Sequence, residues 1–244
     1  MKKEIKILFI AATHGDESIG VEVVRSLKRK GFDFLIGNPE ALKQEKRFID
    51  SDLNRIFPGK IGGSYEERRA IEIIKITKKY DWVIDLHGSI SRTGVFIIIT
   101  KLTIENLYLA LRFGIKRIVI WPGAPETIGS LSTFMPAGIE IESGLRDDPK
   151  IKNQLKNVLV DFLKNKDKAV NFLEAADEKD IFFVTGKLLK NKNKKPDNLK
   201  NWQKIDKENF ALFVNGRFTD AWCFKMIKIK PFKEDLNDLI KKFE

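Results

Sequence analysis

The chain lacks several residues and segments on which whole classes of protein depend. It has 244 residues and a single cysteine, Cys223, so it has no internal disulfide framework. No segment approaches the eighteen consecutive apolar residues that a membrane-spanning helix needs. The first residues, MKKEIKILFIAA, combine a basic start with a short apolar run, and we interpret them as a strand and not as a signal peptide. These absences predict a cytoplasmic globular protein that has no membrane partner.

Charge is plentiful and unequal, with 45 Lys and Arg against 34 Asp and Glu, which gives a net charge of +11. An excess of this size is compatible with nucleic acid, with a membrane surface or with acidic small substrates. The lysines are spread along the chain among glutamates, which favours a solvated surface. No RNA-binding motif with interleaved aromatic residues is visible, so we expect no nucleic-acid partner. A basic nucleic-acid-binding module remains the non-enzyme alternative.

Alternating strand and helix patterns run through the first two thirds of the chain. The expected strands cover residues 4–12, 33–36, 81–87, 95–100, 115–121 and 137–142. The expected helices cover residues 17–30, 39–46, 65–79, 103–113 and 149–165. This alternation predicts an α/β fold with a mainly parallel sheet that helices cover on both faces. Sites of such folds lie beyond the carboxyl ends of the strands.

The pattern changes near residue 168. Apolar strand candidates at 181–187, 209–215 and 222–230 surround a lysine- and asparagine-rich loop at 188–201. We therefore predict a catalytic domain over residues 1–168 and a small β-rich C-terminal region, a lid, over residues 169–244.

The chain has only two histidines, His14 and His87, and each lies at the end of an expected parallel strand. His14 belongs to the segment HGDE, which places Glu17 three residues later. Two histidines and a glutamate form the ligand set of several catalytic zinc sites, whereas a histidine at a strand end can also be purely structural. Asp85 precedes His87 by two residues and either orients it or caps a helix. We predict a zinc site.

The stretch RFIDSDLNRIFPG, Arg47–Gly59, is dense in charged and amide side chains and has neither helical nor strand periodicity. Asn54 and Arg55 are suited to hold a carboxylate, because a guanidinium offers a planar fork of donors. The alternative is a structural Asp–Arg network. We expect Asp50 and Asp52 to hold the arginines in place.

Five segments together resemble one known family. HGDE, the 22 residues NPEALKQEKRFIDSDLNRIFPG (Asn38–Gly59), YEERRA (Tyr65–Ala70), DLHG (Asp85–Gly88) and PAGIE (Pro136–Glu140) occur in the order found in the succinylglutamate desuccinylase/aspartoacylase family. The resemblance covers roughly residues 4–165. It implies a carboxypeptidase-like fold, with a mixed, mainly parallel sheet, and a zinc-dependent deacylase that cleaves the amide bond of N-acyl amino acids, with one zinc ion per chain.

The resemblance also implies roles for individual residues. His14, Glu17 and His87 correspond to the zinc ligands. Arg47 corresponds to an arginine that stabilises the oxyanion. Asn54 and Arg55 correspond to the pair that binds the substrate carboxylate.

The family's catalytic glutamate has two candidates here, Glu140 and Glu142, which are two apart in one expected strand and so face the same way. The family pattern P-x-G-I-E favours Glu140, and its E-x-G pattern favours Glu142. Gly138 supplies a small residue two positions before Glu140. A second buried carboxylate is costly unless it is paired, and this favours Glu140.

The chain departs from the family in two places. The stretch Gly123–Pro136 contains no arginine, and no tyrosine follows Tyr108, although aspartoacylase-type enzymes bind substrate with one of each. Asn215 and Arg217, in ALFVNGRF, are expected to approach the site instead. The acyl group, the amino acid and the oligomeric state, a homo-oligomer included, stay open. A metallocarboxypeptidase, or another amidohydrolase acting on peptides or an acylated cofactor, is the alternative enzyme.

Overall fold

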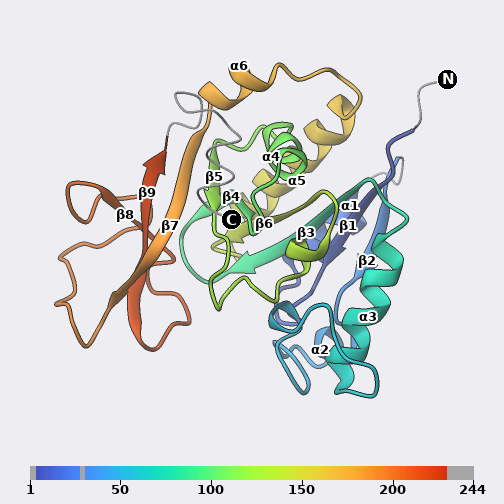
Figure 1. Cartoon of the computed structure of the whole chain (residues 1–244), viewed down its shortest axis with the longest axis horizontal. Coiled ribbons are helices and arrows are strands. Elements are labelled where there is room, and N and C mark those ends of the chain that lie inside the picture. Colours follow the sequence, from blue (N-terminus) through green and yellow to red (C-terminus); the bar gives the residue numbers. More distant parts are fainter. Residues whose placement is uncertain (1–3, 28–30, 230–244) are drawn as a thin grey trace.

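A single mixed sheet runs through the molecule (Figure 1). The computed structural model describes residues 4–27 and 31–229. The strands of this part are β1 (Ile7–Ala11), β2 (Asp33–Ile36), β3 (Trp82–Ser89), β4 (Gly94–Ile99), β5 (Arg117–Ile120), β6 (Gly138–Gly144), β7 (Asp180–Leu189), β8 (Asn209–Leu212) and β9 (Ala221–Ile229). They join in the order β2-β1-β3-β6-β4-β5-β7-β9-β8.

The sheet is mainly parallel in its first part, as predicted. Five neighbouring pairs are parallel, namely β1–β2, β1–β3, β3–β6, β4–β5 and β5–β7. Strand β4 runs antiparallel to β6, and β9 runs antiparallel to both β7 and β8. The mixed, mainly parallel sheet of the predicted fold class is confirmed.

The helices are α1 (Ile19–Ser26), α2 (Pro39–Lys43), α3 (Tyr65–Thr77), α4 (Ile104–Leu111), α5 (Pro149–Asn165) and α6 (Phe172–Asp177), with short 3-10 turns η1 (Leu53–Arg55) and η2 (Leu131–Phe134). All but α6 and the two turns fall where the sequence predicts a helix. Residues 28–30 of one predicted helix and residue 230 of one predicted strand lie outside the described residues. No helix in the described ranges is long and apolar enough to cross a membrane.

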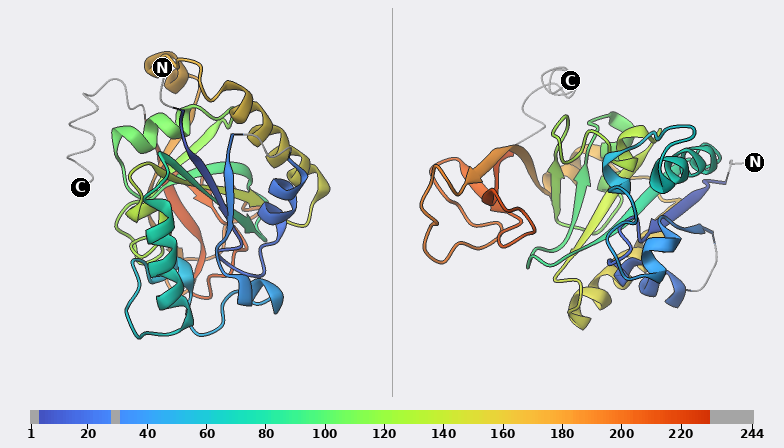
Figure 2. Two further views of the ribbon diagram at one scale, coloured as in Figure 1. Left: turned by 90° about the vertical axis from the view of Figure 1, so that its right-hand side faces the viewer. Right: turned by 90° about the horizontal axis from the view of Figure 1, so that it is seen from below.

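Helices cover both faces of the sheet (Figure 2). Helices α1, α4, α5 and α6 pack on one face, around a core built from Phe9, Ile84, Ile97 and Ile139. Helix α3 and the turns η1 and η2 cover part of the other face. The alternate side chains of β3, β6 and β4 point to that second face, and the candidate site lies there.

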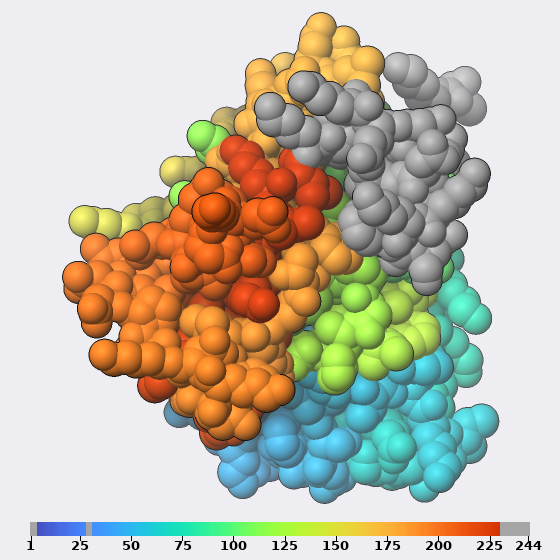
Figure 3. All heavy atoms as spheres, turned by 60° about the vertical axis from the view of Figure 1, so that its left-hand side comes forward, coloured from blue at the N-terminus to red at the C-terminus, as the bar shows by residue number. Residues whose placement is uncertain are grey.

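The C-terminal strands extend the same sheet. Strand β7 pairs with β5, so the chain after residue 168 continues the sheet through β7, β9 and β8. In Figure 3 this region, in orange and red, lies directly against the green and blue body of the molecule. The division into two domains at residue 168 stays a prediction.

Candidate metal and substrate site

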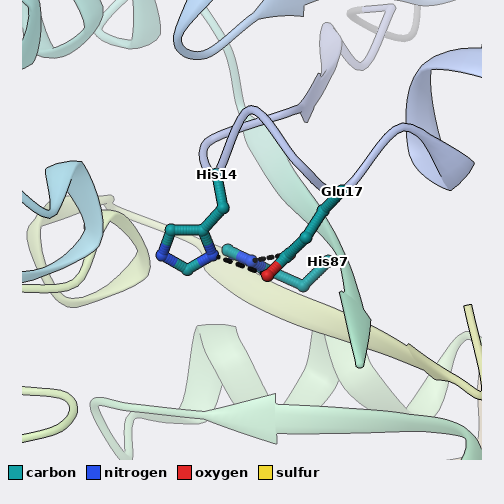
Figure 4. Close-up of side chains that lie close together, drawn as sticks. All are labelled: His14, Glu17 and His87. Carbon is teal, nitrogen blue, oxygen red and sulfur yellow. Dashed lines mark hydrogen bonds and ion pairs between the residues drawn. The ribbon is translucent and has the colours of Figure 1, made fainter. Parts of the chain in front are cut away.

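His14, Glu17 and His87 converge at the end of the central strands (Figure 4). His14 follows β1, Glu17 precedes α1, and His87 lies in β3. Each of the three offers one ligand atom, and these atoms all lie within 4.8 Å of one another. The predicted zinc ligands are therefore brought together, and all three are buried.

The Glu17 carboxylate lies between the two imidazole rings. His14 Nδ1 is 2.9 Å from Glu17 Oε1, and His87 Nδ1 is 3.1 Å from Glu17 Oε2. The backbone N–H of Gly88 also donates to Glu17 Oε2, at 2.9 Å. The same nitrogen of each histidine thus faces the shared carboxylate, which is an arrangement that a divalent cation can use.

The opposite ring nitrogens are held by two aspartates. His14 Nε2 is 3.0 Å from Asp52 Oδ1, and His87 Nε2 is 2.9 Å from Asp85 Oδ2. The Thr13 hydroxyl donates to the second oxygen of Asp85, at 2.8 Å. Carboxylates that hold the outer nitrogen of a ligating histidine fix its orientation and raise its basicity. Of the two readings of Asp85, its contacts favour the orienting one.

The charged groups of the cluster stabilise one another's ionised forms. Burial alone raises the pKa of Glu17, but the two histidines outweigh it and hold this pKa well below its usual value. Burial lowers the pKa of His87, but Asp85 and Glu17 outweigh it and raise this pKa well above 6.5. The pKa of His14 is also raised, because Glu17 and Asp52 outweigh its burial. A buried set of two imidazoles and one carboxylate matches the donors that zinc prefers.

Arg47 lies beside this cluster. Its Nε donates to Asp52 Oδ2 at 3.0 Å, and its guanidinium also approaches Glu17 Oε1, at 3.4 Å. Asp52 therefore contacts both His14 and Arg47, as the prediction that it holds an arginine requires. The same expectation for Asp50 is wrong, because its carboxylate accepts from the backbone N–H of Tyr65 at the start of α3.

A buried glutamate that the sequence analysis did not single out shapes the loop. Glu66 accepts the backbone N–H groups of Ile49, Asp50 and Ser51 at 2.6, 3.0 and 3.2 Å, and the amide of Asn38 at 3.0 Å. Glu66 itself is fully buried. The signal was its place in the YEERRA segment, but nothing in a single sequence says that its carboxylate turns toward the loop.

Asn54 and Arg55 both line the same cavity as the metal cluster. The Asn54 side-chain oxygen accepts from the Leu131 backbone N–H at 3.0 Å, which leaves its amide nitrogen for the cavity side. The backbone of Arg55 packs so closely on Gly129 that a Cβ there would lie 1.9 Å from the Arg55 carbonyl oxygen. The loop after β5 therefore locks this pair in place.

The two candidate glutamates of β6 differ in their surroundings. Glu140 is paired with Asp85 in strand register and accepts from the Ser132 hydroxyl at 2.9 Å. Glu142 is paired with His87, and among the described residues its Oε2 is a buried atom with no hydrogen-bond partner. Burial raises the pKa of Glu142 to about 7, and the carboxylates of Glu17 and Glu140 add to this effect.

The absence of a side chain at Gly138 is explained by packing, independently of the candidate site. A Cβ at this position would lie 2.6 Å from the Met135 Cβ. A small residue before Glu140 therefore carries no information about which glutamate is the base. Because Glu140 already has a hydroxyl partner, the cost of a second buried carboxylate does not exclude Glu142 either.

The cavity has a volume of about 290 Å³ and is lined in part by the C-terminal region. Phe213, Gly216, Arg217 and Phe218 belong to its lining, and Asn215 does not. The expectation that this segment approaches the site thus holds for Arg217. Trp121 also lines the cavity, and its place as the last residue of an expected apolar strand gave no sign of this role.

Comparisons with known proteins show what this chain is similar to. Residues 3–113 match the family described as the succinylglutamate desuccinylase/aspartoacylase catalytic domain. A probable aspartoacylase of Trichodesmium erythraeum is 33% identical over 129 residues, which is 45% of this chain and 44% of the relative. An N-acyl-aromatic-L-amino acid amidohydrolase (carboxylate-forming) of Xenopus laevis is 34% identical over 143 residues, 49% of this chain and 45% of the relative. The matches span less than half of these two relatives.

Solved structures share the fold over nearly the whole chain. Succinylglutamate desuccinylase of Chromobacterium violaceum aligns with a TM-score of 0.72 at 20% identity, covering 93% of this chain and 85% of that one. Murine aminoacylase 3 aligns with a TM-score of 0.71 at 18% identity, covering 94% of this chain and 97% of that one. The fold is thus the carboxypeptidase-like fold that the resemblance implied. The resemblance to the succinylglutamate desuccinylase/aspartoacylase family is thus confirmed, with the match to its catalytic domain over residues 3–113.

Proposed function

We propose that this protein is a zinc-dependent hydrolase that cleaves the amide bond of a carboxylate-bearing N-acyl amino acid. The observation that carries the proposal is the convergence of His14 Nδ1 and His87 Nδ1 on the Glu17 carboxylate. The names of the relatives, which are aspartoacylases and an N-acyl amino acid amidohydrolase, support the same reaction class.

His14, Glu17 and His87 would hold one zinc ion per chain. The chemistry that such an ion supplies is Lewis acidity, which activates water and polarises a carbonyl group. Asp52 and Asp85 keep the two rings in orientation through their outer nitrogens.

Glu142 is the proposed general base, in preference to Glu140. Its Oε2, which has no hydrogen-bond partner among residues 4–27 and 31–229, and its pKa of about 7 suit a group that exchanges protons near neutral pH. It takes a proton from the attacking water as the new C–O bond forms at the carbonyl carbon. It then gives that proton to the amide nitrogen as the C–N bond breaks, so that a carboxylate and an amine leave.

Two further groups orient the substrate. Arg47, held by Asp52, directs positive charge toward the oxygen on which negative charge develops, and one such donor is typically worth roughly 3–4 kcal/mol. Asn54 and Arg55, which line the same cavity, bind the substrate carboxylate. This interaction positions the amide and so affects turnover as well as binding.

A hydrolysis screen tests the proposal. Purified protein with added zinc is incubated with N-acetyl, N-formyl and N-succinyl amino acids, and amine release is measured with and without a chelator. We expect chelator-sensitive release from at least one compound. If every compound stays intact while blocked dipeptides are cleaved, the protein is instead a metallocarboxypeptidase.

A further inference from the structure

On the second face of the sheet, the residues under the cavity change from charged at one end to apolar at the other. His87 in β3 is paired with Glu142 in β6, and Glu140 in β6 is paired with Ile98 in β4. Ile98 is in turn paired with Val119 in β5, and Trp121 lies two residues further on. Because residues two apart share a face, the cavity floor runs from the metal cluster across two carboxylates to an apolar end.

Aromatic rings enclose this apolar end. Trp121 and Phe213 lie with ring centroids 6.2 Å apart, and Phe213 and Phe218 lie 6.4 Å apart. Phe224 packs against two of these rings, with its ring centroid 4.4 Å from that of Trp121 and 4.6 Å from that of Phe218. These rings therefore pack into one continuous wall that comes from two distant parts of the chain.

The charged groups near this end are already engaged. Glu126 lines the cavity and pairs with Lys187 at 2.8 Å, and Lys187 also contacts Asp220 at 3.2 Å. Arg217 pairs with Asp16. Within the described ranges, this end of the cavity thus offers no uncommitted cation to a second carboxylate, whereas Arg55 and Arg47 serve the opposite end.

We propose that Ile98, Trp121, Phe213 and Phe218 form a specificity subsite for an apolar, uncharged group of the substrate. The group is carried by either the acyl part or the amino-acid side chain, and both would present the same chemistry. Burial of apolar surface against these residues supplies the selectivity. This inference rests on the proposed deacylation and narrows its substrate to molecules with one carboxylate.

The first experiment compares four substrates by kcat/KM, with N-acetylglycine as the reference. N-acetylphenylalanine tests the side-chain position, N-benzoylglycine tests the acyl position, and N-acetylaspartate tests a second carboxylate. We expect one of the two aromatic compounds to exceed N-acetylglycine by about tenfold or more, the selectivity typical of an apolar pocket. N-acetylaspartate should not exceed it.

The second experiment removes part of the wall. Phe218 is only half-buried, so Phe218→Ala should fold, and we expect it to lose most of the aromatic preference, measured as the ratio of kcat/KM for the preferred aromatic compound to kcat/KM for N-acetylglycine. Phe210→Ala is the matched control, because Phe210 is a half-buried phenylalanine of the same region that does not line the cavity. It should keep the preference.

Binding separates this inference from the proposed function. Calorimetry of N-acetylphenylalanine and N-benzoylglycine with the zinc-loaded protein reports on the subsite even if no compound is hydrolysed. Tighter binding than N-acetylglycine that is lost in Phe218→Ala supports the subsite. A preference for N-acetylaspartate, or an aromatic preference that Phe218→Ala leaves unchanged, would overturn it.

Discussion

At the scale of single residues, the two glutamates of β6 are separated by what they contact. Glu142→Gln should lower kcat roughly 100- to 10,000-fold, the usual contribution of a general base, and leave zinc content unchanged. Glu140→Gln keeps a partner for the Ser132 hydroxyl and should have a much smaller effect. Steady-state kinetics and metal analysis of both variants check this. An inactive Glu140→Gln beside an active Glu142→Gln would move the base to Glu140.

The histidines give a second prediction at this scale, on pH. In the metal-free protein the pKa of His87 is raised well above 6.5, because Asp85 and Glu17 outweigh its burial. Zinc must therefore displace a proton, so its affinity should rise with pH, up to about tenfold per unit for each proton released. The rise should end once pH exceeds the raised pKa. Zinc titrations across pH measure it, and an affinity independent of pH from 5 to 8 would contradict it.

Protonation of His87 also affects the stability of the metal-free protein. Since its folded-state pKa is raised, its contribution to the free energy of unfolding is fully present below the unfolded value near 6.5. That contribution is lost as pH rises through the folded-state pKa. Zinc should reverse this dependence of the free energy of unfolding on pH, because it binds the deprotonated ring.

At the scale of elements, the loop from Arg47 to Gly59 depends on α3 through one carboxylate. Glu66→Gln replaces an acceptor of three backbone N–H groups with an amide and should reduce the free energy of unfolding by about 1–3 kcal/mol. It should also raise KM, because the loop carries Asn54 and Arg55. Urea denaturation and kinetics check both.

The matched control for this loop is Glu72→Gln on the same helix, where the carboxylate is 63% exposed and pairs, within the described part of the chain, only with Arg69. It should change stability by less than about 0.5 kcal/mol. Equal losses in the two variants would show that the loop does not depend on Glu66.

The elements that the sequence predicted best are those with a strong local signal. Ser64 and Glu67 form the capping box that begins α3, and both of its hydrogen bonds are present. The reversed direction of β4 and the six residues of α6 were not predicted. Strand direction depends on pairing with β6 across the sheet, which no local pattern encodes.

The site was predictable where residue types restrict the chemistry and not where geometry decides. The two histidines and the HxxE spacing were enough to predict that His14, Glu17 and His87 lie together. The choice between Glu140 and Glu142 depends on the hydroxyl of Ser132 and on strand register. The aromatic wall depends on how the C-terminal region folds back over the sheet.

At the scale of the whole molecule, an ion pair joins the C-terminal region to the loop after β1. Arg217 contacts Asp16, which lies between His14 and Glu17, and Arg146 contacts the same carboxylate at 3.4 Å. Because Arg217 is 41% exposed, the pair should add less than about 1 kcal/mol to global stability. Its removal should instead loosen the segment over the cavity.

Arg217→Ala should therefore raise KM and speed amide hydrogen exchange near residues 211–218, with little change in the free energy of unfolding. Lys228→Ala is the control, because it breaks another exposed ion pair of the C-terminal region, with Asp180, away from the cavity. It should leave KM unchanged. Unaltered exchange in Arg217→Ala would show that the ion pair does not hold the segment.

The central claim is a zinc centre built from His14, Glu17 and His87, and the metal content of the purified protein tests it most directly. After dialysis against zinc and then against metal-free buffer, elemental analysis should find one zinc ion per chain in the wild-type protein. The His87→Ala variant, with its fold checked by circular dichroism, should retain none. A wild-type protein without stoichiometric zinc, or a folded His87→Ala that retains it fully, would contradict the claim.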